Sequence, residues 1–514
     1  MYPGSVARRT PDQPAVIMAG TGETLSYREL DERSNQFAHL LRQRGLRRGD
    51  HIAVLLENHV RYLEVCWGAQ RAGLYYTPVN WHLTAAEVDY IVRDCGARLL
   101  VAGVTFLPIV QDLLATDTAL ESVLLIDGSA PGTESYEKTV DTMPVTPIAD
   151  ESEGFDMIYS SGTTGRPKGG KRALLETALD ADDPRKIFFF ELFGLGPNTV
   201  YLMPGAPMYH GAPLRFTMGV HRLGGTNVIM ERFDPLGALS AIERYQVTHS
   251  QWVPTMFVRL LRLSPEERSR HELSSHQMAI HAAAPCPTSV KEQMIDWWGP
   301  ILCEYYGASE GGGITLMSSE DWDAHKGSVG KPVVGEFHVV GEDGEELPVG
   351  ESGVVYFEGG LPIDYHNDPD KTASAYDHHA WNTVGDMGYL DEDGFLYLTD
   401  RKDHMIISGG VNIYPQEIEA VLIRHPAVAD VAVIGVPNAE FGEEVRAVVQ
   451  PLDPGAAGPE LAEELVAFCR GELAGYKCPR QVDFENELPR APSGKLYKRR
   501  VRARYWEGHG TAIG

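Results

Sequence analysis

Hydrophobic residues recur with two different periods along residues 25–100. Residues 26–29 have the form of a helix capping box and are followed by apolar residues on one helical face. The apolar runs at 51–56 and 75–79 have the length of buried strands, and a second capped helix is expected to begin after Thr84. Strands and helices in regular alternation predict a parallel sheet with helices on both faces.

The pattern changes further along the chain. Residues 127–154 are rich in polar and turn-forming types and are expected to form an exposed connection, and a second α/β run covers about 197–330. From about residue 333, short alternating strands predict a small β-rich subdomain. A compact α+β pattern follows residue 403. The predicted fold class is therefore α/β, with two α/β sheets and a β-rich subdomain in a large N-terminal region and a small mobile α+β C-terminal domain.

Composition limits the possible functions. A chain of 514 residues exceeds one ordinary core, and no apolar run reaches the roughly 18 residues needed to cross a bilayer. The six cysteines form no C-x-x-C pair, and no secretory signal is evident, so reduced thiols and a cytoplasmic location are expected. The net charge of −27 disfavours nucleic acid and anionic membranes as partners.

The stretch YSSGTTGRPKG at residues 159–169 offers almost no apolar area for a core. Its glycines would let backbone N–H groups approach phosphate oxygens, its hydroxyls could donate further hydrogen bonds, and Arg166 and Lys168 supply positive charge. A short buried strand at Phe155–Tyr159 is expected to lead into it. This composition predicts a phosphate-binding loop, and a flexible surface loop is the alternative.

The same stretch closely resembles the signature loop of the adenylate-forming superfamily, which includes acyl-CoA synthetases, nonribosomal-peptide adenylation domains and firefly luciferase. One departure is Gly170, where the family usually has a β-branched residue. The resemblance covers about residues 10–505. Further matches occur in the family's order, with single replacements at Ser309, Val384 and Asp400, in the segments 305–310, 381–386, 400–415 and 489–496.

The resemblance implies an ATP site. Tyr306 would offer a flat face to adenine, Ser309 a hydroxyl to the α-phosphate, and Glu310 an oxygen ligand to Mg²⁺. Asp386 would accept the ribose hydroxyls, and Arg401 would pair with ribose and phosphate. The other residues implied to contact nucleotide or coenzyme A, with Thr163 also beside the magnesium, are Ser160, Ser161, Gly162, Thr163, Thr164, Gly165, Lys168, Ala283, Ala284, Pro285, Tyr305, Gly307, Gly409 and Gly410.

The resemblance also implies two catalytic side chains besides Glu310. Lys495, in a C-terminal loop, would neutralise the substrate carboxylate and the α-phosphate as these anions meet. His210 would be the histidine at the gate of the acyl pocket. Asp403 falls at the family's hinge, so the expected domains are 1–402, which binds ATP and the acid, and a mobile domain at 403–514 that carries the lysine.

The segments that wall the family's acyl pocket are 205–212, 253–258 and 311–313. Nearly all of their residues are small or apolar, and none bears a carboxylate that could hold a substrate ammonium. The pocket residues expected are Tyr209, His210, Met256, Gly311 and Gly312. We therefore expect a bulky apolar acid, because three successive glycines remove wall volume. Alternatively, the glycines serve only tight turns and leave a short pocket for acetate-sized acids.

The expected function is that of an ATP-dependent acyl-CoA synthetase. It would convert a carboxylic acid to acyl-AMP with release of pyrophosphate and would then form the CoA thioester. One alternative is a stand-alone ligase that loads a carrier-protein phosphopantetheine. Another is a non-catalytic ATP-binding protein on the same fold, against which the presence of Lys495 counts. The expected partners are the acid and CoA, without an integral membrane segment, and the sequence leaves a homodimer open.

Overall fold

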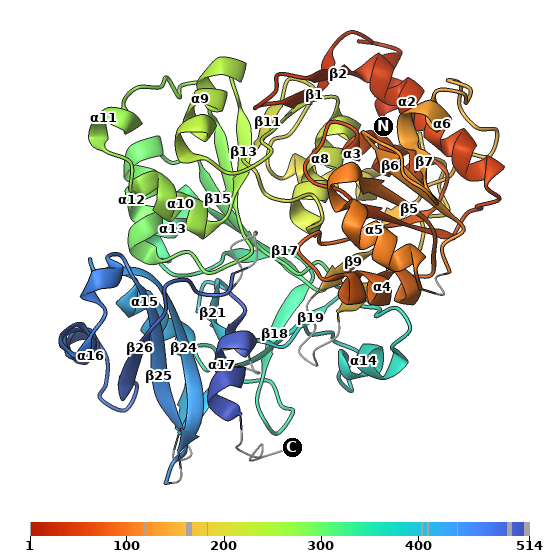
Figure 1. The fold of residues 1–514 in the computed structure, drawn as a ribbon. Coiled ribbons are helices and arrows are strands. Elements are labelled where there is room, and N and C mark those ends of the chain that lie inside the picture. The colour runs from red at the N-terminus through yellow and green to blue at the C-terminus, as the bar shows by residue number, and fades with distance from the viewer. Residues whose placement is uncertain are drawn as a thin grey trace.

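The computed structural model describes residues 2–116, 119–160, 167–181, 183–401, 404–408, 411–438, 440–490 and 496–507. Figure 1 shows a red and orange N-terminal lobe, a green lobe beside it, and a blue C-terminal domain below the green lobe. Strands of a smaller sheet lie between these parts.

The N-terminal lobe is built on a parallel six-stranded sheet in the order β7-β6-β5-β3-β4-β8. Its strands are β3 (His51–Leu55), β4 (Tyr75–Pro78), β5 (Ala97–Gly103), β6 (Ser122–Ile126), β7 (Glu134–Ser135) and β8 (Phe155–Asp156). Its helices are α2 (Tyr27–Gln43), α3 (Tyr62–Arg71), α4 (Ala85–Asp94), α5 (Leu107–Leu114) and α6 (Tyr136–Val140). The predicted alternation is confirmed, and so are the capping boxes at Ser26 and Thr84.

The prediction of an exposed connection at residues 127–154 is wrong in part. Both β7 and α6 lie within it, and Tyr136 and Val140 are fully buried. These two residues lie four positions apart, so they share one face of a short helix. Two apolar anchors among polar neighbours are too few to dominate the composition of the segment, which is why the pattern missed them.

The second lobe is built on a nine-stranded sheet in the order β17-β16-β15-β14-β13-β11-β12-β1-β2. Its strands are β1 (Pro14–Met18), β2 (Thr24–Ser26), β11 (Val200–Met203), β12 (Thr226–Ile229), β13 (His249–Trp252), β14 (Met278–His281), β15 (Leu302–Tyr306), β16 (Ile314–Ser318) and β17 (Lys331–Val334). Its helices are α8 (Gly211–Leu223), α9 (Pro235–Tyr245), α10 (Pro254–Leu261), α11 (Pro265–Arg268), α12 (Thr288–Trp298) and α13 (Ser319–Ala324). Two short helices, α1 (Pro3–Ala7) and α7 (Phe188–Glu191), complete this region.

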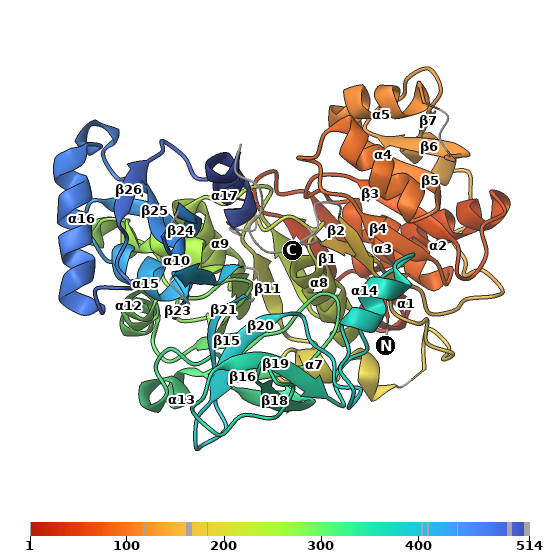
Figure 2. The ribbon, with the colours of Figure 1, turned by 90° about the horizontal axis from the view of Figure 1, so that it is seen from below.

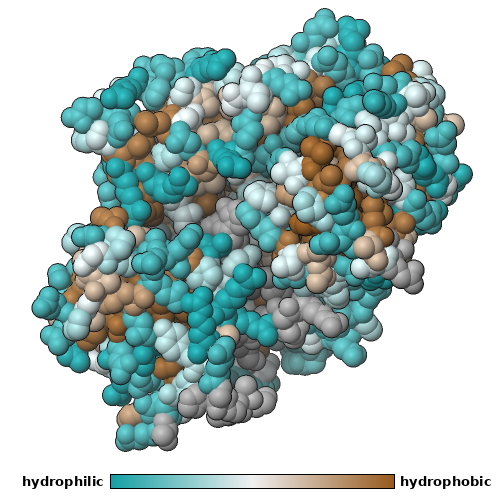
Figure 3. Space-filling model, viewed as in Figure 1, coloured by the Kyte–Doolittle hydropathy of each residue, from teal (hydrophilic) through white to brown (hydrophobic). Residues whose placement is uncertain are grey.

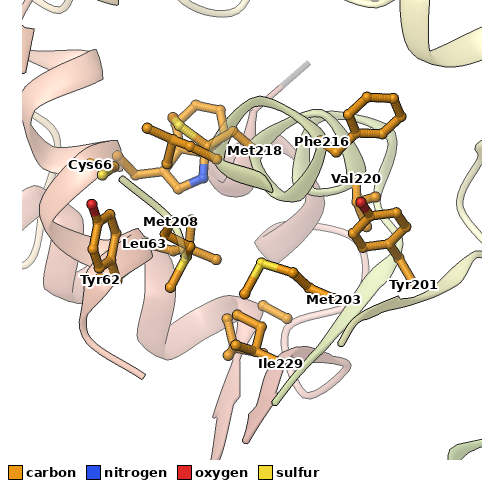
Figure 4. Close-up of a cluster of buried hydrophobic side chains, with 14 of the residues drawn as sticks. Tyr62, Leu63, Cys66, Tyr201, Met203, Met208, Phe216, Met218, Val220 and Ile229 are labelled. Atoms are coloured by element: carbon orange, nitrogen blue, oxygen red, sulfur yellow. The ribbon is translucent and has the colours of Figure 1, made fainter. Parts of the chain in front are cut away.

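Helix α8 joins the two lobes. Figure 4 shows Tyr62, Leu63 and Cys66 of α3 on one side of it, and Tyr201, Met203 and Ile229 of the nine-stranded sheet on the other. These residues belong to one continuous buried core. The position of α8 between two packed layers explains why its residues can reach a site between the lobes.

The predicted β-rich subdomain is confirmed as a four-stranded antiparallel sheet. It contains β18 (Glu336–Val340), β19 (Gly353–Glu358), β20 (Asp386–Leu390) and β21 (Leu396–Arg401), with α14 (Pro369–Ser374) between β19 and β20. Figure 2 shows β18, β19 and β20 in the lower central part of the view, with the blue domain to their left and the red and orange lobe to their upper right. A two-stranded hairpin, β9 (Ile158–Ser160) and β10 (Lys168–Gly170), lies apart from these sheets.

The C-terminal domain has its own sheet and core. Its strands are β22 (Ile406–Ser408), β23 (Val411–Ile413), β24 (Val428–Asn438), β25 (Gly442–Pro451) and β26 (Gln481–Phe484), and its helices are α15 (Pro415–Leu422), α16 (Pro459–Glu472) and α17 (Lys498–Trp506). The chain passes from one sheet to the next between Arg401 and Ile406. Across the junction, Arg262 donates a hydrogen bond to the carbonyl oxygen of Ala429 at 3.2 Å.

No described helix combines the length and the apolar character needed to cross a membrane. On the face shown in Figure 3, hydrophilic residues predominate, and the hydrophobic ones form separate patches.

Candidate active site

A cavity of about 2120 Å³ lies where the two lobes, the β-rich subdomain and the C-terminal domain meet. Several of its walls are loops that follow the carboxyl ends of parallel strands, where open α/β sheets commonly bind ligands. The predicted site residues that line it are Ser160, Lys168, Tyr209, His210, Ala283, Ala284, Pro285, Tyr305, Tyr306, Gly307, Ser309, Glu310 and Asp386. Folding thus brings together side chains from five separate segments of the chain.

Other predicted site residues lie outside the described part of the chain. They are Ser161, Gly162, Thr163, Thr164, Gly165, Asp403, Gly409, Gly410 and Lys495, together with the side chain of Arg401. Their roles therefore stay predictions.

The predicted phosphate loop connects β9 to β10. Ser160 is paired with Lys168 in the antiparallel hairpin, so the two ends of the loop lie side by side. Lys168 forms an ion pair with Asp368, the N-cap residue of α14, and its hydrogen bond to that carboxylate raises the pKa of the lysine. A Cβ atom on Gly170 would lie 3.3 Å from the Cα of Glu310. Glycine in place of a β-branched residue therefore lets the hairpin lie close to Glu310.

Tyr306 and Asp386 are brought into direct contact. The Tyr306 hydroxyl donates a hydrogen bond to Asp386 Oδ2 at 2.7 Å. Tyr306 ends β15 of the nine-stranded sheet, and Asp386 begins β20 of the four-stranded sheet. The two residues expected to hold adenine and ribose therefore lie close enough together to hold adjacent parts of one nucleoside.

Two arginines of the cavity wall were not singled out from the sequence as site residues. Arg215 on α8 pairs with Asp156 Oδ2 at 2.8 Å and donates to the carbonyl oxygen of Ser309 at 3.2 Å. Burial lowers the pKa of Arg215, but the charge of Asp156 and its hydrogen bond more than offset this, so the pKa is raised. Burial and then Arg215 lower the pKa of Arg172 to about 10. The sequence feature that could have revealed them is Asp156, a carboxylate within a buried strand pattern. A buried charge requires a partner of opposite charge, so an arginine or lysine was to be expected nearby.

Glu310 lies beside these cations. Its charge acts on the pKa of both Arg172 and Arg215, and it lines the cavity. Among the residues that the structure describes, no hydrogen bond or ion pair engages the Glu310 carboxylate. A half-buried carboxylate with free oxygen lone pairs fits the ligand requirements of Mg²⁺.

Several carboxylates in the cavity wall come from outside the segments expected to form the acyl pocket, and two of them, Asp156 and Glu153, belong to buried ion pairs. Asp156 is neutralised by Arg215, and Glu153 contacts both Lys186, at 2.8 Å, and Arg222. The wall is therefore not free of carboxylates, as the three pocket segments alone suggested. Because both carboxylates already have cationic partners, neither is available to a substrate ammonium without breaking a buried pair.

The expected pocket residues Met256, Gly311 and Gly312 are not among the described residues that line the cavity, whereas Thr255 and Val258 are. Met256 is buried in the core. A Cβ atom on Gly311 would lie 2.5 Å from the carbonyl oxygen of Pro362, and one on Gly312 would lie 2.8 Å from the ring of Phe357. These glycines therefore allow the chain to pack against the β-rich subdomain, and the expectation that they enlarge the acyl pocket is wrong.

Comparisons with known proteins agree with this geometry. The chain matches the model of the AMP-binding enzyme family over residues 5–361 and that of the AMP-binding enzyme C-terminal domain over residues 417–495. It is 33% identical over 524 residues to a feruloyl-CoA synthase of Amycolatopsis sp., with 98% of both chains covered. It is 31% identical over 540 residues to a long-chain-fatty-acid–CoA ligase of Escherichia coli O6:H1, with 98% of this chain and 93% of the relative covered.

Solved structures share the whole architecture. The crystal structure of ATP-bound MatB from Rhodopseudomonas palustris superposes with a TM-score of 0.83 at 30% identity, covering 98% of this chain and 99% of that one. The expected fold class is confirmed by this similarity, including the separate C-terminal domain.

Proposed function

Since the chain belongs to the AMP-binding enzyme family and is an ATP-dependent acyl-CoA synthetase, we propose that it activates a bulky apolar carboxylic acid as an acyl-AMP and transfers the acyl group to coenzyme A. In the first step a carboxylate oxygen attacks the α-phosphorus of ATP, and pyrophosphate leaves. In the second step the thiol sulfur attacks the acyl carbon, the thiol proton is lost, and AMP leaves.

The observation that carries the proposal is that one cavity joins the Tyr306–Asp386 pair to a wall that is mainly apolar and aromatic. An apolar acyl group gains about 25 cal/mol for each Å² that it buries there. A substrate ammonium would be desolvated beside Asp156 and Glu153, which Arg215, Lys186 and Arg222 already neutralise, and the Glu310 carboxylate would be taken by the magnesium ion. The wall therefore favours an acid without an amino group.

The adenylation step brings two anions together, so it depends on positive charge gathered locally in a chain of net charge −27. Lys168, Arg172 and Arg215 line the cavity, and Glu310 and Thr163 would hold Mg²⁺. When bound, the magnesium ion would supply screening of the phosphate charge. Lys495 would add a cation at the reacting groups, as electrostatic stabilisation of the transition state requires. His210, at the N-cap of α8, would border the entrance for the acid.

The thioester step would require the C-terminal domain to move. Sheet membership changes between Arg401 and Ile406, and Asp403 lies in that interval, which supports the domain boundaries 1–402 and 403–514. A rotation there would bring Gly409 and Gly410 to the pantetheine arm, where the absence of side chains would let the arm run along the backbone. A cytoplasmic location also stays a prediction.

The test is pyrophosphate release with ATP and a panel of acids: acetate, octanoate, an aryl acid, a fused-ring acid and an amino acid. The expected result is a specificity constant that is highest for a bulky acid without an amino group. Preference for acetate or the amino acid would contradict the proposed substrate class. Thioester detection with CoA, and separately with a phosphopantetheinylated carrier protein, distinguishes the two acceptors. A non-catalytic ATP-binding protein would release no pyrophosphate with any acid.

A further inference from the structure

A cluster of aromatic rings forms one wall of the cavity. Phe189 and Phe190 come from α7, Phe216 from α8 and Tyr305 from β15, and all four line the cavity. The ring of Phe189 meets that of Tyr305 edge-on, with centroids 5.6 Å apart and planes at 79°. It meets that of Phe216 at 5.5 Å and 72°. Edge-to-face contact is the arrangement that aromatic rings prefer, so the same wall can accept one more ring in that geometry.

A glycine keeps this wall in place. A Cβ atom on Gly219 of α8 would lie 2.7 Å from the ring of Phe190, so the absence of a side chain lets Phe190 lie against the helix backbone. Phe190 also meets Phe216 edge-on at 5.5 Å and 77°. Figure 4 shows Phe216 and Tyr201 on the same side of α8, and their rings are parallel within 9° at 6.1 Å.

A directed chain of hydrogen bonds ends at this wall. The hydroxyl of Tyr201, which is fully buried, donates to Gln251 Oε1 at 3.1 Å. The amide of Gln251 in turn donates from Nε2 to the Tyr305 hydroxyl oxygen at 3.3 Å. Because that oxygen accepts from Gln251, the Tyr305 hydroxyl hydrogen is left to donate elsewhere.

Both ends of this last hydrogen bond border the cavity. Gln251 and Tyr305 are cavity-lining residues, and Tyr305 is only partly buried. Burial raises the pKa of Tyr305 above its usual value, although Arg215 and the Gln251 hydrogen bond lower it, so the hydroxyl stays protonated at neutral pH. The aromatic wall therefore contains a hydroxyl donor whose oxygen is held by Gln251, and Gln251 is in turn oriented by Tyr201.

We propose that Tyr305 is a specificity-determining residue, and that the acyl substrate is an aromatic acid with a hydrogen-bond-accepting oxygen on or beyond its ring. The ring packs against Phe189 and Phe190, with the buried Phe216 behind them, and the oxygen accepts from Tyr305. This inference rests on the proposed function, and it narrows the bulky apolar acid to an oxygenated aryl acid. A site built to donate a hydrogen bond discriminates against analogues that lack the acceptor, because the donor then loses its partner.

The experiment compares matched acids by specificity constant for pyrophosphate release: cinnamate, its 4-hydroxy, 4-methoxy and 4-carboxy derivatives, and octanoate. The hydroxyl, methoxy and carboxylate arms distinguish the sources of the acceptor oxygen. We expect the unmodified enzyme to prefer at least one oxygenated acid over cinnamate by about tenfold, and to prefer both over octanoate.

In the structure Tyr305 packs its ring on Phe189 and accepts from Gln251, so its proposed role replaces the nucleotide contact that the resemblance implied for it. Tyr305→Phe keeps the ring and removes the donor. It should lower the specificity constant for the preferred oxygenated acid by about tenfold while changing that for cinnamate by less than about twofold. Gln251→Met removes the amide that orients the hydroxyl and should weaken the same preference. Tyr356→Phe, on β19 away from the cavity, is the matched control and should change neither value.

Equal losses for cinnamate and the oxygenated acids in Tyr305→Phe would overturn the inference, and so would a preference of the unmodified enzyme for cinnamate or octanoate. Equilibrium binding of the same acids, measured by calorimetry, separates the two levels of the proposal. A Tyr305-dependent binding preference without pyrophosphate release would overturn the proposed function and support the subsite. Release of pyrophosphate without any Tyr305-dependent preference would support the proposed function and overturn the subsite.

Discussion

The Tyr306 hydroxyl lies 2.7 Å from the carboxylate of Asp386, and this hydrogen bond links the nine-stranded sheet to the four-stranded sheet. The orientation of the tyrosine ring toward the cavity is thereby tied to the carboxylate proposed to hold the ribose. Substitution of either residue should therefore weaken ATP binding partly by releasing the other residue from this hydrogen bond.

We expect Tyr306→Phe to raise the KM for ATP by about fivefold while leaving kcat nearly unchanged, because the ring remains and one neutral-to-charged hydrogen bond is lost. Asp386→Asn should raise the KM further, since the amide accepts the ribose hydroxyls less well than a carboxylate does. Initial rates at varied ATP concentration measure both effects. A change in kcat alone would show that the pair acts on the chemical step instead.

Lys495→Ala tests the proposed electrostatic role of the C-terminal loop. Adenylation should fall by about 2.7–4 kcal/mol in transition-state stabilisation, whereas thioester formation from supplied acyl-AMP should persist. The reason is that only the first step brings two anions together. Separate measurement of acyl-AMP formation and of thioester formation decides the matter, and equal losses in both steps would refute the assignment.

His221 makes stability depend on pH. Its Nδ1 accepts from Trp67 at 3.1 Å, so its Nε2 carries the proton and donates to the carbonyl oxygen of Ala15 at 3.0 Å. Burial lowers its pKa to about 4, whereas an unfolded histidine has a pKa of about 6.5. Between these values the unfolded chain binds a proton that the folded chain does not. The contribution of neutral His221 to stability is therefore complete above pH 6.5 and falls by about 1.4 kcal/mol per pH unit between pH 6.5 and about pH 4.

The matched variant is His221→Gln, because a glutamine oxygen can accept from Trp67 and its amide can donate to Ala15 without titrating. Melting temperatures recorded from pH 7.5 to pH 5 should decrease less steeply for this variant than for the unmodified protein. Parallel curves would mean that His221 does not contribute to the pH dependence.

Gly312 is required for packing rather than for pocket volume. It has φ +88°, and a Cβ atom would lie 2.8 Å from the Phe357 ring, so Gly312→Ala should destabilise the protein by about 1–3 kcal/mol. Gly49→Ala is the control, because Gly49 also has a positive φ, of 89°, but has open space around it. Thermal melts should show the larger loss for Gly312→Ala. If Gly312→Ala changed the preference for the size of the acyl group, Gly312 would contribute to the wall of the acyl pocket, and our conclusion about its packing role would be wrong.

Local patterns predicted much of this fold because they involve neighbours in the sequence. Ser26 and Glu29 lie three residues apart and form the predicted capping box. Strands β3 and β4 are buried throughout, so their apolar runs stood out clearly. The segments that hold Lys168, Tyr306 and Asp386 also matched known motifs, and the cavity brings them together as expected.

The parts that the sequence could not predict depend on long-range packing. Asp156 and Arg215 are 59 residues apart, and nothing local to either residue names the other as its partner. Gly311 and Gly312 were assigned to the pocket because glycine has no side chain and so leaves space. The groups that fill this space, Pro362 and Phe357, come from the β-rich subdomain and could not be identified from the local sequence. The aromatic wall likewise combines α7, α8 and β15, which meet only in the folded chain.

Strand β1 is synthesised long before β12, the strand with which it pairs in parallel. Val16 of β1 is paired with Asn227 of β12, so at about 5–20 residues per second a ribosome needs about 10–40 s to synthesise the partner after β1. During that interval the antiparallel strand β2 is the neighbour available to β1, and the core in which Ala15, Val16 and Met18 are buried is incomplete. The six-stranded lobe, whose strands all precede residue 157, can form within the same interval. A nascent chain of this protein can therefore carry a folded six-stranded lobe while the β1–β2 hairpin still exposes apolar side chains, and we expect a holdase chaperone to act on that hairpin.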